Sequence, residues 1–384
     1  MIVLVLRAGC GSHVMVDLRR NLLRIGKKIL FSGNLKWTAE QMVKYICIKC
    51  ADHLRISPLS GPFMGDIIVT YRCNYRCPMC GFVGKQYAGK EFDTQYMISL
   101  LDDIYKLGTT AVVFSGGEPL LRKDIGVLIR HAKRKGMIVY LITNGHLLSE
   151  ENVIEDVLKI PPDNINISLD SARPDTHDRL RGYSGSFTVV KEGIQKLIFK
   201  RNKKKARCII TTVTVLSEEN IDEVKDIYSL SSKLEVDAVG FIPLQTFQEK
   251  TISCSDEGFY RKVESAIDFL ISKKRRKGKP IVENTVRYLS MFPLALTGRE
   301  SAVRCIAGYA SCFVDAYGNV FGCLPRVETG EIIGNIKEKP LPEIWNSAEY
   351  NRWRMKMRDC RCCFWNCQTE LNLLFNKIEN IKIK

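Results

Sequence analysis

The stretch Cys73-Asn74-Tyr75-Arg76-Cys77-Pro78-Met79-Cys80 places three cysteines directly after the apolar run Asp66-Ile67-Ile68-Val69-Thr70. The apolar run predicts a β-strand, and the cysteines then lie on the loop that leaves it. Their spacing lets three sulfurs converge on one side of a metal cluster. Electron-carrier clusters usually have four thiolate ligands, so three thiols leave one iron open for chemistry. A zinc site or buried free thiols are the alternatives.

Apolar strands alternate with helical patterns from Asp66 to about Pro243. After the first strand, the predicted strands are Thr110–Phe114, Ile138–Ile142, Asn164–Leu169, Cys208–Val215 and Ala238–Ile242, with helical segments near 94–107, 123–135, 149–158, 186–200 and 219–233. This alternation gives right-handed βαβ crossovers and a parallel sheet with helices outside. The fold class is therefore α/β, a partial (βα)6 TIM-like barrel whose ligands gather at the carboxyl ends of the strands.

Glycine-rich and polar sequences lie at the ends of three of these strands. Ser115-Gly116-Gly117-Glu118-Pro119-Leu120 follows the second strand, where two glycines let the backbone approach a ligand closely. Thr143-Asn144-Gly145 follows the third strand, although a turn alone needs no more than Asn-Gly. The fourth strand ends in Ser168-Leu169-Asp170. All three sequences are expected at the ligand-binding edge of the sheet.

The cysteine loop, followed about forty residues later by Gly-Gly-Glu-Pro, resembles the radical S-adenosylmethionine (radical SAM) enzymes. In that family the three cysteines, here Cys73, Cys77 and Cys80, hold a 4Fe-4S cluster whose open iron is chelated by S-adenosylmethionine (SAM). The resemblance implies that the reduced cluster cleaves SAM to methionine and a 5′-deoxyadenosyl radical, which abstracts a hydrogen atom from a substrate. Met79 stands where the family commonly has an aromatic residue against the adenine, and its thioether makes similar contacts.

The resemblance also assigns the SAM-binding residues. Gly116–Pro119 corresponds to the motif that binds the methionyl amine, and Asn144 lies in a further family landmark. Ser168 and Arg181 correspond to residues that bind the SAM carboxylate, and Asp170 to one near the ribose. The complete implied set is Met79, Gly116, Gly117, Glu118, Pro119, Asn144, Ser168, Asp170 and Arg181.

Two residues near the fourth strand leave alternatives open. The stretch from Ser168 to Arg181 is one residue longer than in the family pattern, so Arg179 is the alternate ligand of the carboxylate. His177 is expected to be a structural hydrogen-bonding residue rather than a catalytic base. No catalytic residue is identified beyond the cluster.

A second cysteine pattern begins at Cys305. Cys305, twelve residues, Gly318, four residues and Cys323 resemble the opening of the twitch and SPASM extensions of radical SAM enzymes. The intervening stretch 313–321 alternates between apolar and polar residues around Tyr-Gly-Asn, which predicts a hairpin that presents both cysteines together. A small C-terminal α+β domain of the twitch/SPASM type is therefore expected.

The expected ligands of one auxiliary 4Fe-4S cluster are Cys305, Cys323, Cys360 and Cys363. Cys312, Cys362 and Cys367 are expected to lie outside this set. Cys367 is the rival for Cys360 or Cys363, because Cys363-x3-Cys367 also brings two thiols together. A distal pattern that ends so soon indicates a twitch-like extension with one cluster.

Composition limits the partners. The 58 Lys and Arg against 42 Asp and Glu give a net charge of +16, which either favours acidic partners or only solvates the surface. The basic run Lys273–Lys277 has no aromatic interleaving, so nucleic acid is not favoured. Fifteen cysteines without a signal peptide or an apolar run of membrane-spanning length predict a reducing, cytoplasmic location.

Four segments are expected: a helical preamble over 1–62, the radical SAM core over 63–250, a helical connector over 251–299 and the auxiliary-cluster domain over 300–384. The preamble has a basic amphipathic helix over 15–31, which either docks on its own domain or contacts an anionic membrane. Its second predicted helix, Trp37–Leu54, contains Cys47-x2-Cys50, which is interpreted as structural because no partner pair lies nearby.

The sequence thus predicts an oxygen-sensitive radical SAM enzyme that takes electrons from a reductant such as a ferredoxin or flavodoxin. Its substrate is a small molecule, a lipid-linked molecule or a peptide. The alternative from another class is a non-catalytic iron–sulfur binding or scaffold protein, and cleavage of SAM on reduction would discriminate the two.

Overall fold

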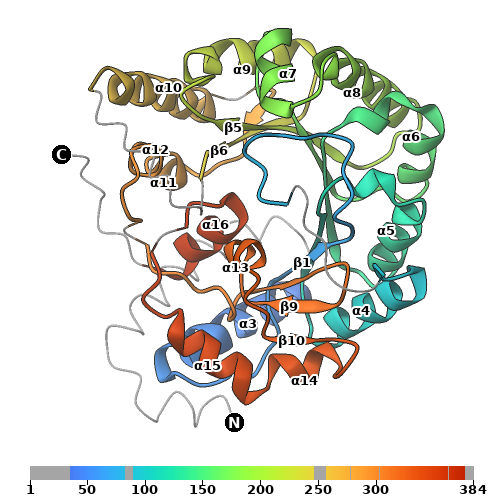
Figure 1. The fold of residues 1–384 in the computed structure, drawn as a ribbon, viewed down its shortest axis with the longest axis vertical. Helices are drawn as coiled ribbons and strands as arrows, with labels where there is room; N and C mark the ends of the chain where they lie inside the picture. The colour runs from blue at the N-terminus through green and yellow to red at the C-terminus, as the bar shows by residue number, and fades with distance from the viewer. Residues whose placement is uncertain are drawn as a thin grey trace.

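The computed structural model describes residues 35–82, 90–245, 257–276, 278–301, 303–361 and 363–376. The amphipathic helix expected over 15–31 lies outside them. Ten strands form one sheet in the order β10-β9-β8-β1-β2-β3-β4-β5-β6-β7. Figure 1 shows helices around the outside of this curved sheet, while the C-terminal elements, in orange and red, lie across the opening of the curve.

The core strands are parallel and follow one another in chain order. They are β1 (Met64–Ile68), β2 (Ala111–Ser115), β3 (Ile138–Thr143), β4 (Asn164–Ser168), β5 (Ile209–Leu216), β6 (Ala238–Pro243) and β7 (Ile281–Val282). The six predicted strands and the parallel sheet are confirmed. The short strand β7 was not predicted, because two residues have no readable periodicity.

Seven helices follow or connect these strands. They are α4 (Thr94–Lys106), α5 (Ile125–Arg134), α6 (Glu151–Val157), α7 (Pro174–Arg181), α8 (Ser186–Lys203), α9 (Val224–Lys233) and α10 (Glu257–Arg275). In α4, the Asp93 side chain caps the first turn by accepting from the Tyr96 backbone N–H at 3.0 Å. Its buried residues Met97, Leu100, Leu101 and Ile104 recur at helical spacing. One apolar face per helix therefore packs on the sheet.

The strands have two different faces. On β3, Val139 and Leu141 are completely buried in the core that the helices share, whereas Tyr140 and Ile142 are partly exposed. On β5, Val213 and Val215 are partly exposed in the same alternating way. We call the side that bears these partly exposed residues, away from the outer helices, the inner face. Solvent therefore reaches the inner face.

The C-terminal strands extend the core sheet. β8 (Ser311–Val314) pairs in parallel with β1, and β9 (Asn319–Phe321) returns antiparallel to β8, which confirms the predicted hairpin. β10 (Gly334–Asn335) completes the edge. The buried carboxylate of Asp315 orders the turn, because it accepts from the backbone N–H groups of Tyr317 and Asn319, both at 2.9 Å. The domain boundaries expected at 63, 251 and 300 stay a prediction.

Short helices complete the C-terminal part. They are α11 (Val286–Leu289), α12 (Phe292–Leu296), α13 (Leu324–Thr329), α14 (Leu341–Trp345), α15 (Ala348–Lys356) and α16 (Asn366–Phe375). The predicted N-terminal helix is present as α3 (Leu35–Leu54), and it packs on this part of the chain. Tyr45 of α3 stacks on Phe375 with ring centroids 4.6 Å apart, and Asp52 forms an ion pair with Arg304. None of the described helices is long and apolar enough to cross a membrane.

The turn between β8 and β9 provides a test of the docking of the C-terminal strands. Gly318 has a φ of +88°, and an added Cβ would lie 2.5 Å from Cζ of the buried Phe92. Gly330 has a similar φ of +74° but open space around it. We expect Gly330→Ala to cost about 1–2 kcal/mol from the left-handed backbone. Gly318→Ala should cost about 1–3 kcal/mol more from the clash. Equal shifts in chemical denaturation would contradict this packing.

Candidate functional site

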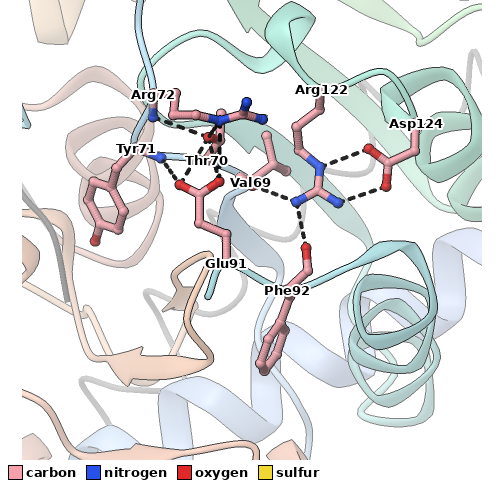
Figure 2. A network of polar contacts seen from close by, with 8 residues as sticks. All are labelled: Val69, Thr70, Tyr71, Arg72, Glu91, Phe92, Arg122 and Asp124. Atoms are coloured by element: carbon pink, nitrogen blue, oxygen red, sulfur yellow. Dashed lines mark hydrogen bonds and ion pairs between the residues drawn. The ribbon is translucent and has the colours of Figure 1, made fainter. Parts of the chain in front are cut away.

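Glu91 joins the two ends of the cysteine loop. Its carboxylate accepts from the backbone N–H of Tyr71 at 2.7 Å and from the Thr70 hydroxyl at 2.8 Å (Figure 2). The guanidinium of Arg72 lies 3.7 Å from the same carboxylate. Residues 70–72 lead into the first cysteine, whereas Glu91 lies where the chain leaves the loop. These contacts therefore fix both ends of the loop together.

Arg122, which follows the Gly-Gly-Glu-Pro motif in sequence, also joins the two ends of the cysteine loop. Its Nη1 donates to the carbonyl of Val69 at 3.0 Å and to that of Phe92 at 2.8 Å (Figure 2). Asp124 accepts from Nε and Nη2 of Arg122, at 2.9 and 2.7 Å. The guanidinium is buried, so it satisfies two backbone carbonyls that have little access to water. Neither Glu91 nor Arg122 was predicted as a site residue.

The two glycines of the motif contact the start of the loop through the backbone. Gly117 donates its N–H to the carbonyl of Thr70, and Glu118 donates its N–H to that of Arg72, both at 2.8 Å. A Cβ on Gly117 would lie 2.2 Å from the carbonyl oxygen of Arg72. No other residue fits there without a shift of the backbone. The motif therefore fixes the backbone of residues 70–72, where the chain leaves β1.

The three thiols of the loop are partly exposed and lie among hydrogen-bond donors. The backbone N–H groups of Tyr75 and Phe82 donate to the sulfurs of Cys73 and Cys80, each at 3.4 Å. The Arg181 side chain interacts with the sulfur of Cys77. Burial raises the pKa values of the Cys73 and Cys77 thiols. Bound iron would offset this, because coordination deprotonates a thiol.

Arg181 is held beside Cys77 by Asp170. Its Nη2 lies 2.7 Å from Oδ2 of Asp170, whose carboxylate is fully buried and also accepts from the Val215 N–H at 2.9 Å. Nε of Arg181 is buried and has no hydrogen-bond partner among the described residues. Arg179, by contrast, is exposed and pairs with Glu219 at 2.8 Å. Of the two arginines, the structure brings Arg181 to the cysteine loop.

Glu118 joins the ends of β2 and β3. Its carboxylate is fully buried and accepts from the Thr143 hydroxyl and the Asn144 N–H, both at 2.7 Å. Burial raises the pKa of Glu118 to about 7. Asn144 in turn donates from Nδ2 to the side chain of Asn74 on the cysteine loop at 2.8 Å. Glu118 thus positions Asn144 against the loop, and its predicted contact with the methionyl amine stays a prediction.

The remaining predicted residues lie around this edge. Ser168 ends β4 partly exposed, Met79 is partly exposed on the loop, and Pro119 begins the 3-10 helix η1 (Pro119–Leu121). His177 accepts from the Asp170 N–H through Nδ1 at 3.2 Å, and burial lowers its pKa to about 3. A neutral buried imidazole in this contact agrees with the structural role expected for it. The ribose contact of Asp170 stays a prediction, because its carboxylate is occupied by Arg181.

Four cysteines of the C-terminal part come together. Burial and the charges of Cys305, Cys323 and Cys360 all raise the pKa of the Cys363 thiol. The Cys305 N–H donates to the Cys360 carbonyl at 3.0 Å, which joins the two cysteine-bearing segments. Burial raises the pKa values of Cys305 and Cys323 to about 12. These are the four expected ligands.

The other C-terminal cysteines differ in position. Cys312 is completely buried on β8, next to the charge of Asp66. Cys367 is an exposed residue at the start of α16, and burial of its sulfur, followed by nearby carboxyl groups, raises the pKa of its thiol. Cys362 lies outside the described residues.

Two family models match the chain, and each covers one of the two cysteine patterns. The radical SAM superfamily model matches residues 67–231, and the SPASM model, an iron-sulfur cluster-binding domain, matches residues 305–368. An AdoMet-dependent heme synthase of Methanosarcina barkeri (strain Fusaro / DSM 804) is 30% identical over 316 residues, 76% of this chain and 83% of that protein. An Fe-coproporphyrin III synthase of the same organism is 23% identical over 304 residues, 72% of each chain.

Solved structures share the fold. SuiB of Streptococcus suis bound to S-adenosylmethionine matches with a TM-score of 0.62 at 15% identity, over 90% of this chain and 80% of SuiB. Native anSMEcpe with bound AdoMet and the Kp18Cys peptide matches with a TM-score of 0.59 at 16% identity, over 76% of this chain and 82% of anSMEcpe. This chain belongs to the radical SAM superfamily and has a C-terminal SPASM domain. Its cofactors are a catalytic 4Fe-4S cluster, SAM and an auxiliary cluster.

The described residues fit these cofactors. Three thiols with donors around them suit a cluster with an open iron, and the unpartnered Nε of Arg181 suits an anion bound next to that cluster. The four gathered thiols of the C-terminal part suit a fully protein-ligated second cluster.

Removal of Arg122 tests how the loop is held. Arg122→Ala would leave the buried carbonyls of Val69 and Phe92 without their donor, and each unsatisfied acceptor costs about 1–3 kcal/mol. We expect a large loss of stability and fewer irons per chain after anaerobic reconstitution. The exposed neighbour Lys123→Ala is the matched control and should change neither. Equal iron contents in the two variants would contradict this role of Arg122.

Proposed function

We propose that this enzyme cleaves SAM reductively to a 5′-deoxyadenosyl radical that abstracts a hydrogen atom from a small-molecule substrate. The catalytic cluster, bound by Cys73, Cys77 and Cys80, supplies the electron. The observation that supports this function best is the convergence of the three-thiol loop, the Gly-Gly-Glu-Pro motif and Arg181, whose Nε lacks a partner among the described residues, at one edge of the sheet.

The chain's own residues would hold and orient SAM. Arg181 presents Nε and is restrained by Asp170, so its fork of donors is preorganised for a carboxylate. Ser168, the last residue of β4, would contribute a hydroxyl to the SAM carboxylate. Gly116 and Gly117 allow close approach of the methionyl amine, and Met79 would contact the adenine. The auxiliary cluster would be bound by Cys305, Cys323, Cys360 and Cys363.

A small molecule is favoured as the substrate by the relatives with higher identity. They are named for heme and Fe-coproporphyrin III, which are small molecules. The peptide-bound neighbours are only about 15% identical and support the fold alone. The described part before β1 is the single helix α3, which packs on the C-terminal part rather than extending a peptide-binding module.

Loss of one loop thiol tests the function. Anaerobically reconstituted protein with dithionite and SAM should form 5′-deoxyadenosine, measured by chromatography with mass detection. Cys77→Ala should abolish this, because the catalytic cluster would lack a ligand. Cys208→Ala removes a buried thiol away from both cysteine patterns and should retain it. Undiminished product from Cys77→Ala would overturn the function.

The carboxylate ligand is tested by comparing two arginines of α7. Arg181→Lys keeps a positive charge beside Asp170 but loses the fork, and we expect SAM binding to weaken by about 2 kcal/mol, ~30-fold. Arg179→Lys, on the exposed side of the same helix, should bind SAM normally. Equilibrium binding of SAM to the reconstituted proteins measures this. The reverse ranking would show that the longer stretch shifts the ligand to Arg179.

A further inference from the structure

Cys367 is an exposed residue outside the group formed by Cys305, Cys323, Cys360 and Cys363. It lies at the second position of α16, and Figure 1 shows α16 on the inner-face side of the sheet. Burial is the largest cause that raises the pKa of its thiol, and the carboxyl groups of Asp66 on β1, Glu283 just after β7 and Glu370 on α16 raise it further. Its own charge acts on Tyr140, which is partly exposed on the inner face of β3. The groups that interact electrostatically with this sulfur therefore include residues of β1 and of the inner face of β3.

Unpartnered polar atoms of the inner strands form a second, independent observation. Asp66 is only 6% exposed, yet its Oδ2 has no hydrogen-bond partner among the described residues. Oδ1 of Asn166 on β4 is also buried without a partner there. Burial raises the pKa of Asp66 to about 8, so this carboxyl group is largely protonated at neutral pH. Buried polar atoms without partners mark a place where a ligand supplies the missing hydrogen bonds.

The surroundings of Cys367 separate it from the auxiliary cluster. The thiols that act on Cys363 are Cys305, Cys323 and Cys360, whereas carboxylates act on Cys367. Cys363 lies in the segment before α16, whereas Cys367 is the second residue of that helix. One belongs to the group of four, and the other faces the inner strands.

We propose that Cys367 is a catalytic residue whose thiol donates a hydrogen atom to a substrate carbon radical held against the inner face. This inference rests on the proposed function, which generates the radical. An S–H bond is weaker than an alkyl C–H bond, so transfer of hydrogen from the thiol to a carbon radical is downhill. Asp66 and Asn166 would bind the substrate from the strands opposite.

The steps balance with one additional electron. The 5′-deoxyadenosyl radical takes a hydrogen atom from a substrate C–H bond, and the substrate radical then takes the hydrogen of the Cys367 S–H bond. The resulting thiyl radical accepts one electron from the low-potential donor that also reduces the catalytic cluster, and one proton from the Asp66 carboxyl group. Each turnover consumes one SAM, two electrons and one proton. The substrate regains a C–H bond, so the reaction class is isomerisation without net oxidation.

The test uses the 5′-deoxyadenosyl radical itself as the carbon-radical probe. Holoenzyme is given SAM and dithionite in deuterated buffer without substrate, and mass spectrometry measures deuterium in the 5′-deoxyadenosine formed. The Cys367 thiol exchanges with solvent, so we expect one deuterium per product molecule from the unsubstituted protein. Cys367→Ser should lower this fraction at least fivefold, because an O–H bond is too strong to donate.

The matched control is Cys47→Ser, a partly exposed thiol on α3, which should leave the deuterium fraction unchanged. Iron content and electron paramagnetic resonance are measured with Cys73, Cys77 and Cys80 all replaced by alanine, which isolates the C-terminal site. In that background Cys367→Ala should retain the auxiliary signal, and Cys360→Ala should lose it.

Each outcome has one meaning. An unchanged deuterium fraction in Cys367→Ser, or loss of the auxiliary signal in Cys367→Ala, would overturn the role of Cys367 while leaving SAM cleavage intact. Absence of 5′-deoxyadenosine from the unsubstituted protein would instead overturn the proposed function. The fraction is taken per product molecule, so a change in the rate of SAM cleavage does not affect it.

Discussion

The guanidinium of Arg122 is the interaction on which the cysteine loop most depends. The described residues on the two sides of this loop, 69–72 and 91–92, are joined by side chains. Arg122 donates to the carbonyls on both sides of the loop, and Glu91 accepts from its first residues. Both contacts lie next to Gly116 and Gly117, whose backbone packs on residues 70–72 just after β1. The loop geometry is therefore set by neighbours of the SAM motif.

The two cysteine sites are buried enough that their thiols resist losing a proton. Burial raises the pKa values of the thiols in both sites, and this disfavours thiolates until a metal binds. At the cysteine loop, backbone N–H donors and Arg181 favour the thiolate forms and partly offset this effect of burial. At the C-terminal site four thiols crowd together, so mutual repulsion adds to burial. Cluster binding and folding of the C-terminal part are consequently coupled.

The sequence predicted the repeating elements of the fold better than the contacts between distant parts. Periodicity is local, so the six strands and the five helical segments predicted between them were readable, whereas the short helix α7 was not predicted. The Tyr-Gly-Asn turn marked the hairpin between Cys305 and Cys323. The pairing of β8 with β1 joins residues about 250 positions apart, and no local sequence pattern predicts it. Glu91 and Arg122 were missed for the same reason, because their partners are backbone groups of other segments. The choice of Arg181 over Arg179 also required the fold, since only one side of α7 faces the loop.

The net charge of the chain describes the outer surface and not the inner face. The charge of +16 favours acidic partners at the exterior, yet the groups around Cys367 are the carboxyl groups of Asp66, Glu283 and Glu370. Burial raises the pKa of Glu283 to about 7 and that of Asp66 to about 8, so these groups are partly neutral and can donate as well as accept hydrogen bonds. A substrate group that brings its own negative charge here would favour their protonated forms. A cationic group would favour the ionised forms, and the charge of the substrate and the protonation of the inner face are therefore linked.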